Sequence, residues 1–155
     1  MKGNPVVISK LDELLAEELT AINEYMVEAE MCENWGYERL HQEIQKIAIQ
    51  EMKHAEYLIQ RILFLEGTPT VSKLNQLHIG SNVENMLANG LAGEISASAA
   101  YNQAIRLCAD ANDNGSRELL KNILKDEEEH IDWLEAQIDQ VKQMGLPIYL
   151  AGQAR

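Results

Sequence analysis

The chain has only two cysteines, Cys32 and Cys108, and they form neither a CxxC nor a CxxCH pattern. Their scarcity excludes a disulfide framework, a zinc knuckle and covalently attached haem. Positive charge is also scarce, because 13 Lys and Arg stand against 25 Asp and Glu, giving a formal net charge of −12. Phosphate backbones bind basic surfaces, so we expect no nucleic-acid partner.

Long apolar runs are missing as well. No segment approaches the roughly 18 apolar residues of a membrane span, and the N-terminus MKGNPVVISK lacks the apolar core of a signal peptide. We therefore expect a cytoplasmic protein that makes no membrane contact. Apolar residues are nevertheless plentiful, at 46% of the 155 residues, which suits one domain with a sizeable core.

The few turn-forming clusters divide the chain into long periodic runs. Breaks fall at Gly36, GTP (67–69), DANDNGS (110–116) and GLP (145–147). We expect helices at about 5–35, 37–66, 82–110 and 114–144, with a short helix at about 147–154. Ser81 and Glu84 form a capping-box pattern at the start of the third run.

Two of the connections are short and predict antiparallel hairpins, whereas residues 67–80 are long enough to cross the bundle. The sequence therefore predicts an all-α fold, in one domain over residues 1–155. The expected architecture is a ferritin-like four-helix bundle, with one long crossover between helices two and three and a short C-terminal fifth helix.

Each long run carries one glutamate where the helical period calls for an apolar residue. These four are Glu18, Glu51, Glu94 and Glu127. The stretches EMKH (51–54) and EEEH (127–130) add His54 and His130 one turn later. The glutamates of each half lie 33 residues apart, with the turn midway, and the halves repeat at an offset of 76. Each hairpin therefore brings its two glutamates level, and a two-fold relation brings all four together.

A single glutamate on a helix is usually solvated or part of an isolated salt bridge. Four buried carboxylates without cations are unfavourable, because each ion loses several kcal/mol of solvation. No Lys or Arg lies at matching height in the inward stripes. Two divalent metals would balance the charge, and carboxylate with imidazole favours iron or manganese. One Glu from each of two helices and Glu-x-x-His from each of the others is the pattern of di-iron bundles.

The sequence resembles the bacterioferritins, the haem-containing branch of the ferritins, over nearly its whole length. The resemblance is carried by ELTAINEY, NWG, EMKHAE, RILFLEG, LHIG, DEEEHIDWLE and MGLPIYL. The paired Glu/Glu-x-x-His motif alone is shared with other ferritin-like proteins, including rubrerythrins. Rubrerythrins usually also carry a four-cysteine rubredoxin domain, for which this chain has neither the cysteines nor the length.

The resemblance implies a homo-oligomeric shell of 24 subunits, built from dimers, with ferroxidase activity. The shell would oxidise Fe(II) with O2 or H2O2 and store the Fe(III) mineral inside. A ferredoxin-type protein is the implied electron donor for iron release. Family members often carry His and Asp where this chain has Lys46 and Gln50 on the polar side of helix two. This difference argues against an accessory iron site on the inner surface.

The resemblance also implies two iron ions per subunit. Glu51 and Glu127 would bridge them, Glu18 and His54 would complete one iron, and Glu94 and His130 the other. Tyr25 matches a tyrosine close to the centre, with a catalytic redox role. Core packing is the alternative reading of Tyr25, as it is of Tyr101.

Met52 follows Glu51 by one residue and therefore lies about 100° away around the helix. It falls in an apolar strip with Ile49, Ile59 and Leu63, which a lone bundle does not need. Together with Leu19, Ile22 and Met26 on helix one, this strip predicts a dimer interface.

A thioether is a competent axial ligand of haem iron. The resemblance implies haem b held by Met52 of both subunits, hence one haem per dimer. Simple packing of Met52 remains open. Two alternative functions also remain open, a non-haem ferritin and a ferritin-like di-iron oxidase or peroxidase without mineral storage.

We expect no special role for the remaining polar and sulfur-containing residues of interest. His41 and His78 are expected at the surface, and Cys32 and Cys108 as small packing residues. Asp126, Glu128 and Glu129 are expected to be solvated or to lie at subunit contacts.

Overall fold

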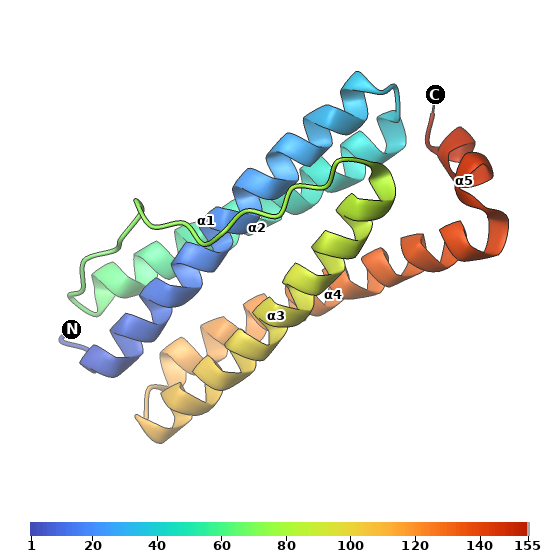
Figure 1. The fold of residues 1–155 in the computed structure, drawn as a ribbon. Coiled ribbons are helices and arrows are strands. Elements are labelled where there is room, and N and C mark those ends of the chain that lie inside the picture. The colour runs from blue at the N-terminus through green and yellow to red at the C-terminus, as the bar shows by residue number, and fades with distance from the viewer. Residues whose placement is uncertain (155) are drawn as a thin grey trace.

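The computed structural model describes residues 1–154, and this range contains five α-helices and no strand. The helices are α1 (Pro5–Asn34), α2 (Glu38–Phe64), α3 (Val83–Asp110), α4 (Asn114–Met144) and α5 (Leu146–Gln153). The hairpin α1–α2 packs beside the hairpin α3–α4, and the extended segment between α2 and α3 runs back along α1 (Figure 1). The predicted all-α bundle with one long crossover and a short fifth helix is confirmed.

Short polar side chains define where the long helices begin. Asn4 accepts a hydrogen bond from the backbone N–H of Val6 at 2.8 Å and so caps α1. The prediction that Ser81 caps α3 is wrong, because Asn82 Oδ1 accepts from the Asn85 N–H at 2.9 Å. Asparagine and serine are equally good caps, so residue type alone could not decide between two adjacent candidates.

The apolar core consists of two clusters at different heights in the bundle. One contains Leu11, Leu58, Tyr101 and Leu120 with their neighbours. The other contains Ala29, Ile44, Leu87, Leu134 and Tyr149 with theirs. Along each long helix, the residues of one cluster precede the inward glutamate and those of the other follow it. Apolar burial on both sides thus fixes a narrow polar layer in the middle of the bundle.

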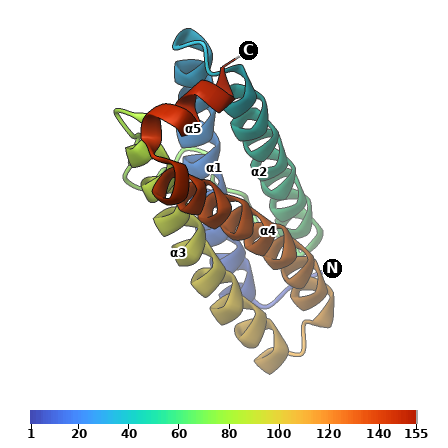
Figure 2. The same cartoon turned by 90° about the vertical axis from the view of Figure 1, so that its right-hand side faces the viewer.

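Contacts at the two ends of the bundle fix the remaining segments. At one end, the Arg61 guanidinium of α2 donates to Asp113 at 2.9 Å and to Ser116 at 2.8 Å, which ties α2 to the α3–α4 turn. At the other end, α5 lies across the bundle (Figure 2). An isolated helix of eight residues is unstable in water, but buried Tyr149 anchors α5 by donating to Gln137 at 2.8 Å.

His41 does not lie on the surface, so that expectation is wrong. It belongs to the first turn of α2, is 8% exposed, and places Nδ1 2.9 Å from the carbonyl oxygen of Ala29 in α1. His78 is exposed as expected. Cys32 and Cys108 are buried as unpaired thiols, which confirms that they are small packing residues. Within residues 1–154, no helix is both long enough and apolar enough to span a membrane.

Candidate metal centre

The polar layer between the two core clusters collects side chains from all four long helices. Each of the six is at most 5% exposed. They are Glu18 from α1, Glu51 and His54 from α2, Glu94 from α3, and Glu127 and His130 from α4. The structure therefore brings together every residue that the sequence pattern grouped.

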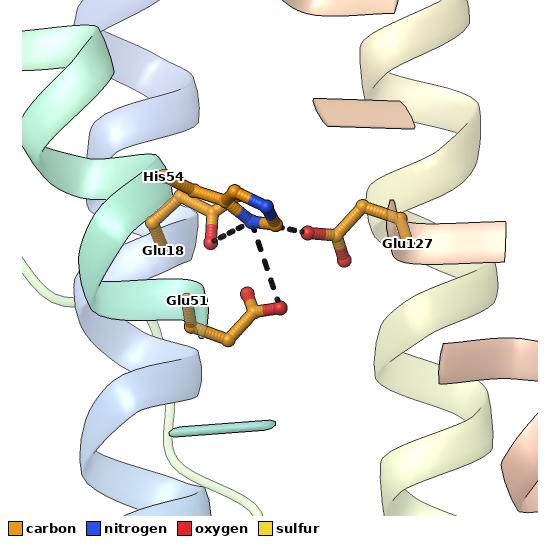
Figure 3. Close-up of side chains that lie close together, drawn as sticks. All are labelled: Glu18, Glu51, His54 and Glu127. Atoms are coloured by element: carbon orange, nitrogen blue, oxygen red, sulfur yellow. Dashed lines mark ion pairs between the residues drawn. The ribbon is translucent and has the colours of Figure 1, made fainter. Parts of the chain in front are cut away.

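The first half of the layer surrounds the Nδ1 atom of His54. This nitrogen lies 3.0 Å from Glu127 Oε1, 3.7 Å from Glu18 Oε2 and 3.8 Å from Glu51 Oε1. Figure 3 shows the three carboxylates pointing toward one another and toward the imidazole from the two hairpins. Ligand atoms from these four residues lie within 4.8 Å of one another, close enough to share one cation.

The second half is built in the same way around the Nδ1 atom of His130. This nitrogen lies 3.0 Å from Glu51 Oε1, 3.3 Å from Glu94 Oε1 and 3.9 Å from Glu127 Oε2. These four residues form a second group with ligand atoms within 4.8 Å of one another. Glu51 and Glu127 belong to both groups, so two cations held here would share two carboxylates.

The hydrogen-bonding capacity of this layer is only partly filled. Buried polar atoms nearly always have a partner, and each one without costs about 1–3 kcal/mol. Seven buried side-chain atoms lack one: Glu18 Oε2, Glu51 Oε1, His54 Nδ1, Glu94 Oε2, both Glu127 carboxylate oxygens and His130 Nδ1. Among residues 1–154, no Lys or Arg pairs with any of the four glutamates. Oxygen and imidazole donors aimed at shared points fit divalent transition-metal ions.

Without metal, the layer holds protons instead. Burial, reinforced by the charge of Glu18, raises the pKa of Glu127 to about 10 and that of Glu51 well above its usual range. For His54, burial opposes the charged form, but the nearby carboxylates of Glu127 and Glu18 outweigh it and raise the pKa to about 11. For Glu94, burial is outweighed by the nearby Glu127 and His130 and by the hydrogen bond from Tyr25, and its pKa falls. Cations entering this layer must therefore displace protons.

Two buried tyrosines donate hydrogen bonds to Glu94 and Glu18, the glutamates that belong to only one of the two groups. Tyr25 donates to Glu94 Oε1 at 2.6 Å, and Tyr101 donates to Glu18 Oε1. Burial raises the pKa of both phenols well above its usual value, so both keep their protons. Reading Tyr101 as packing alone missed its bond to Glu18. The offset of 76, which relates Tyr25 to Tyr101, was the available signal.

The outer ring nitrogens of the two histidines also have partners. His54 Nε2 lies 2.8 Å from Asp126 Oδ2, and His130 Nε2 lies 2.6 Å from Gln50 Oε1. Asp126 is therefore not merely a solvated or subunit-contact residue, and Gln50 does not simply belong to the polar face of α2. Both residues immediately precede a Glu-x-x-His motif and are related by the same offset of 76.

A cleft of about 460 Å³ reaches this layer between α1 and α3. All four glutamates of the layer line it, as do Glu24 and Glu28 of α1 and the exposed His78. Small residues in its wall, including Ala21, Gly90 and Gly93, leave room between the helices. The cleft therefore has an acidic wall that extends from α1 to the polar layer.

The bundle and its layer define the ferritin-like class of carboxylate proteins, in which two helices give one Glu each and two give Glu-x-x-His. The family model for Ferritin, described as a ferritin-like domain, matches residues 8–144. The chain belongs to this family and, within it, to the bacterioferritins.

Several curated relatives carry this similarity over nearly the full chain. The chain is 41% identical to a bacterioferritin of Brucella melitensis, over 94% of this chain and 90% of the relative. It is 40% identical to a bacterial ferritin of Synechocystis sp., over 99% of each chain. It is 38% identical to a bacterioferritin of Mycobacterium leprae, over 97% of this chain and 95% of the relative.

Proposed function

We propose that this protein stores and detoxifies iron by acting as a ferroxidase. Fe(II) is oxidised to Fe(III) at the centre formed by the six buried residues, and the Fe(III) mineral is stored inside a shell of subunits. The observation that carries the proposal is the set of seven buried ligand atoms without hydrogen-bond partners. They fall into two groups that share Glu51 and Glu127.

Each subunit binds two iron ions in this proposal. Glu51 and Glu127 would contribute to both positions, because each lies close to both histidines. The remaining ligands divide into two pairs, with Glu18 and His54 on one iron and Glu94 and His130 on the other. Two Fe(II) ions would each give one electron, and these two electrons with two protons would reduce O2 to H2O2, or H2O2 to two water molecules. The chain contributes four carboxylates that balance two divalent charges, and a bundle that fixes their positions.

Tyr25 is proposed as a redox-active residue beside this centre. Its buried phenol bonds to Glu94, a proposed iron ligand, at 2.6 Å. Loss of an electron from the phenol to O2 or H2O2 at the centre would release its proton, and the Glu94 carboxylate is in position to accept it. Tyr101 donates a hydrogen bond to Glu18 in the equivalent place, so Tyr101→Phe is the matched control for Tyr25→Phe. A tyrosyl radical formed during iron oxidation should be absent from Tyr25→Phe and present in Tyr101→Phe.

Fast iron oxidation tests the centre directly. Either Glu94→Ala or His130→Ala removes ligands from one iron and should abolish rapid Fe(II) oxidation in a stopped-flow experiment, while the subunits still assemble. Glu84→Ala removes an exposed glutamate from the same helix as Glu94 and should leave the rate unchanged. Oxidation at the parent rate in the two ligand variants would refute the assignment.

We further propose that the subunits form dimers and that twelve dimers form a 24-subunit homo-oligomer. Support comes from large apolar side chains exposed on one flank: Met26 at 51%, Ile49 at 45%, Met52 at 45% and Leu63 at 57%. The other expected flank residues, Leu19, Ile22 and Ile59, are partly buried against the subunit's own core. Size-exclusion chromatography separates this shell from the alternative, a ferritin-like oxidase or peroxidase that builds no mineral-filled cage.

Haem b at the dimer two-fold, one per two subunits, is the proposed role of Met52. A half-exposed thioether in an apolar flank suits a soft axial ligand for a non-covalently held haem. Met52→Leu keeps the side-chain volume, so the shell should assemble and oxidise iron but lack the Soret band. Met26→Leu, on the same flank, should retain it. A parent protein without haem after expression with haem available would favour the non-haem ferritin alternative.

Two further proposals rest on the family resemblance alone. The protein works in the cytoplasm, and a ferredoxin-type protein supplies the electrons that release stored iron.

A further inference from the structure

The two halves of the metal centre differ in one hydrogen-bonding partner. The offset of 76 pairs Tyr25 with Tyr101, and both donate to a terminal glutamate. The same offset pairs Gln50 with Asp126, and here the chemistry differs. His54 Nε2 meets a carboxylate oxygen of Asp126 at 2.8 Å, whereas His130 Nε2 meets an amide oxygen of Gln50 at 2.6 Å.

The geometry assigns the roles of the ring nitrogens. In both histidines Nδ1 faces the glutamates and has no hydrogen-bond partner, whereas Nε2 faces outward to Asp126 or Gln50. A histidine that binds metal through Nδ1 carries its proton on Nε2 and donates it to the outer partner. The contacts cross between hairpins, because Asp126 of α4 supports His54 of α2 and Gln50 of α2 supports His130 of α4.

The two outer partners act differently on the inner nitrogen. A hydrogen bond to a carboxylate is roughly twice as strong as one to a neutral amide. It draws the Nε2 proton outward and makes Nδ1 a better electron donor to a metal. The side chain of Asp126 is one-third exposed, so this contact is only partly screened by water. Lys46 lies one turn before Gln50 on α2. It forms an ion pair with Glu43 at 2.6 Å, so its positive charge is balanced there.

We propose that Gln50 and Asp126 are positioning residues that make the two metal positions unequal. The position formed by Glu18 and His54 binds a divalent cation more tightly and fills first, while the position formed by Glu94 and His130 fills second. This inference rests on the proposed metal centre. Outer partners of ligating histidines typically change metal affinity by about 10- to 100-fold, which sets the expected difference between the two positions.

Co(II) tests the order of filling without any redox chemistry. Crystals of the assembled protein are soaked with less than one Co(II) per subunit, and anomalous scattering at the cobalt edge reports the occupancy of each position. In the parent protein the Glu18/His54 position should dominate. In the double variant Gln50→Asp/Asp126→Asn the Glu94/His130 position should dominate. The double variant has the same net charge as the parent, so it separates the placement of the carboxylate from the overall negative charge.

A titration in solution provides the second readout. Cobalt d–d absorption should rise in two resolved steps in the parent protein. The single variant Asp126→Asn keeps a hydrogen-bond acceptor and should merge the two steps, and it also serves if the double variant fails to assemble. Equal occupancy of the two positions in the parent crystal, or an unchanged order in the double variant, would overturn the inference and leave the centre itself intact. No cobalt at either position in the parent would instead refute the proposed function.

Discussion

Replacing Glu127 by glutamine should stabilise the metal-free protein. Burial, then the charge of Glu18, raises the pKa of Glu127 from 4.5 to about 10. At pH 7 the folded chain therefore keeps this proton, whereas the unfolded chain releases it. At pH 7 the proton must be taken up about 2.5 pH units above the unfolded-state pKa of 4.5. This uptake costs about 3 kcal/mol of folding free energy, at about 1.4 kcal/mol per unit. This is an upper limit, because neighbouring carboxylates can hold the proton instead. Glutamine has nearly the same shape and no proton to take up.

Metal should reverse the order of stability. Ligand at 100 times its Kd stabilises a folded protein by about 2.7 kcal/mol per site. The parent gains this from each cation, but Glu127→Gln lacks a bridging carboxylate and one of the four negative charges. For 150–250 residues, 1 kcal/mol corresponds to about 2–4 °C in Tm. The variant should therefore melt up to about 6–12 °C above the parent in chelator, and the gap should close or invert in Co(II).

Calorimetry of both proteins, in EDTA and in saturating Co(II), measures these differences. Glu129→Gln is the matched control, because Glu129 is an exposed neighbour in the same helix and should alter neither melting temperature. A variant that melts below the parent in EDTA would show that Glu127 is not a strained metal ligand. Equal stabilisation of variant and parent by Co(II) would show that it is not a ligand.

Two other predictions concern the subunit surface and pH. The double variant Ile49→Glu/Leu63→Glu places two charges on the exposed flank of α2 and should prevent assembly, as measured by sedimentation velocity. The control Ile95→Glu, at an exposed position of α3, should assemble normally. Normal assembly of the double variant would exclude this flank as the interface. Burial raises the pKa of Glu28 from 4.5 to about 7. As the pH rises from 4.5 to 7, Glu28 ionises in the unfolded chain before it ionises in the folded one, so the parent loses stability. Relative to the parent, Glu28→Gln should thus gain up to about 3 kcal/mol across that window, measured by denaturant unfolding, and a gain independent of pH would contradict the reasoning.

The fold and the six central residues could be predicted from the sequence because each depends on periodicity. An inward glutamate breaks an apolar stripe visibly, and the spacing around each turn fixes its height. The contacts of Gln50 and Asp126 could not be predicted in the same way. They lie at the edge of the stripe, and whether they reach a histidine depends on how one hairpin is rotated against the other.

Local chemistry limited the other expectations. Asn82 was preferred over Ser81 as a cap although both are suitable residue types, so the choice depends on backbone conformation. His41 follows a turn and was expected at the surface, but α2 begins against the end of α1, which buries the ring. Patterns along one helix carry little information about contacts of this kind between neighbouring helices.

The proposed centre is tested most directly by iron itself. Crystals of the parent protein soaked in excess Fe(II) without oxygen should show two anomalous peaks per subunit at the iron edge. Both irons should lie within coordination distance of Glu51 and Glu127. One should also be coordinated by Glu18 and His54, and the other by Glu94 and His130. A polar layer free of iron under these conditions, or one iron held without Glu51 and Glu127, would contradict the account.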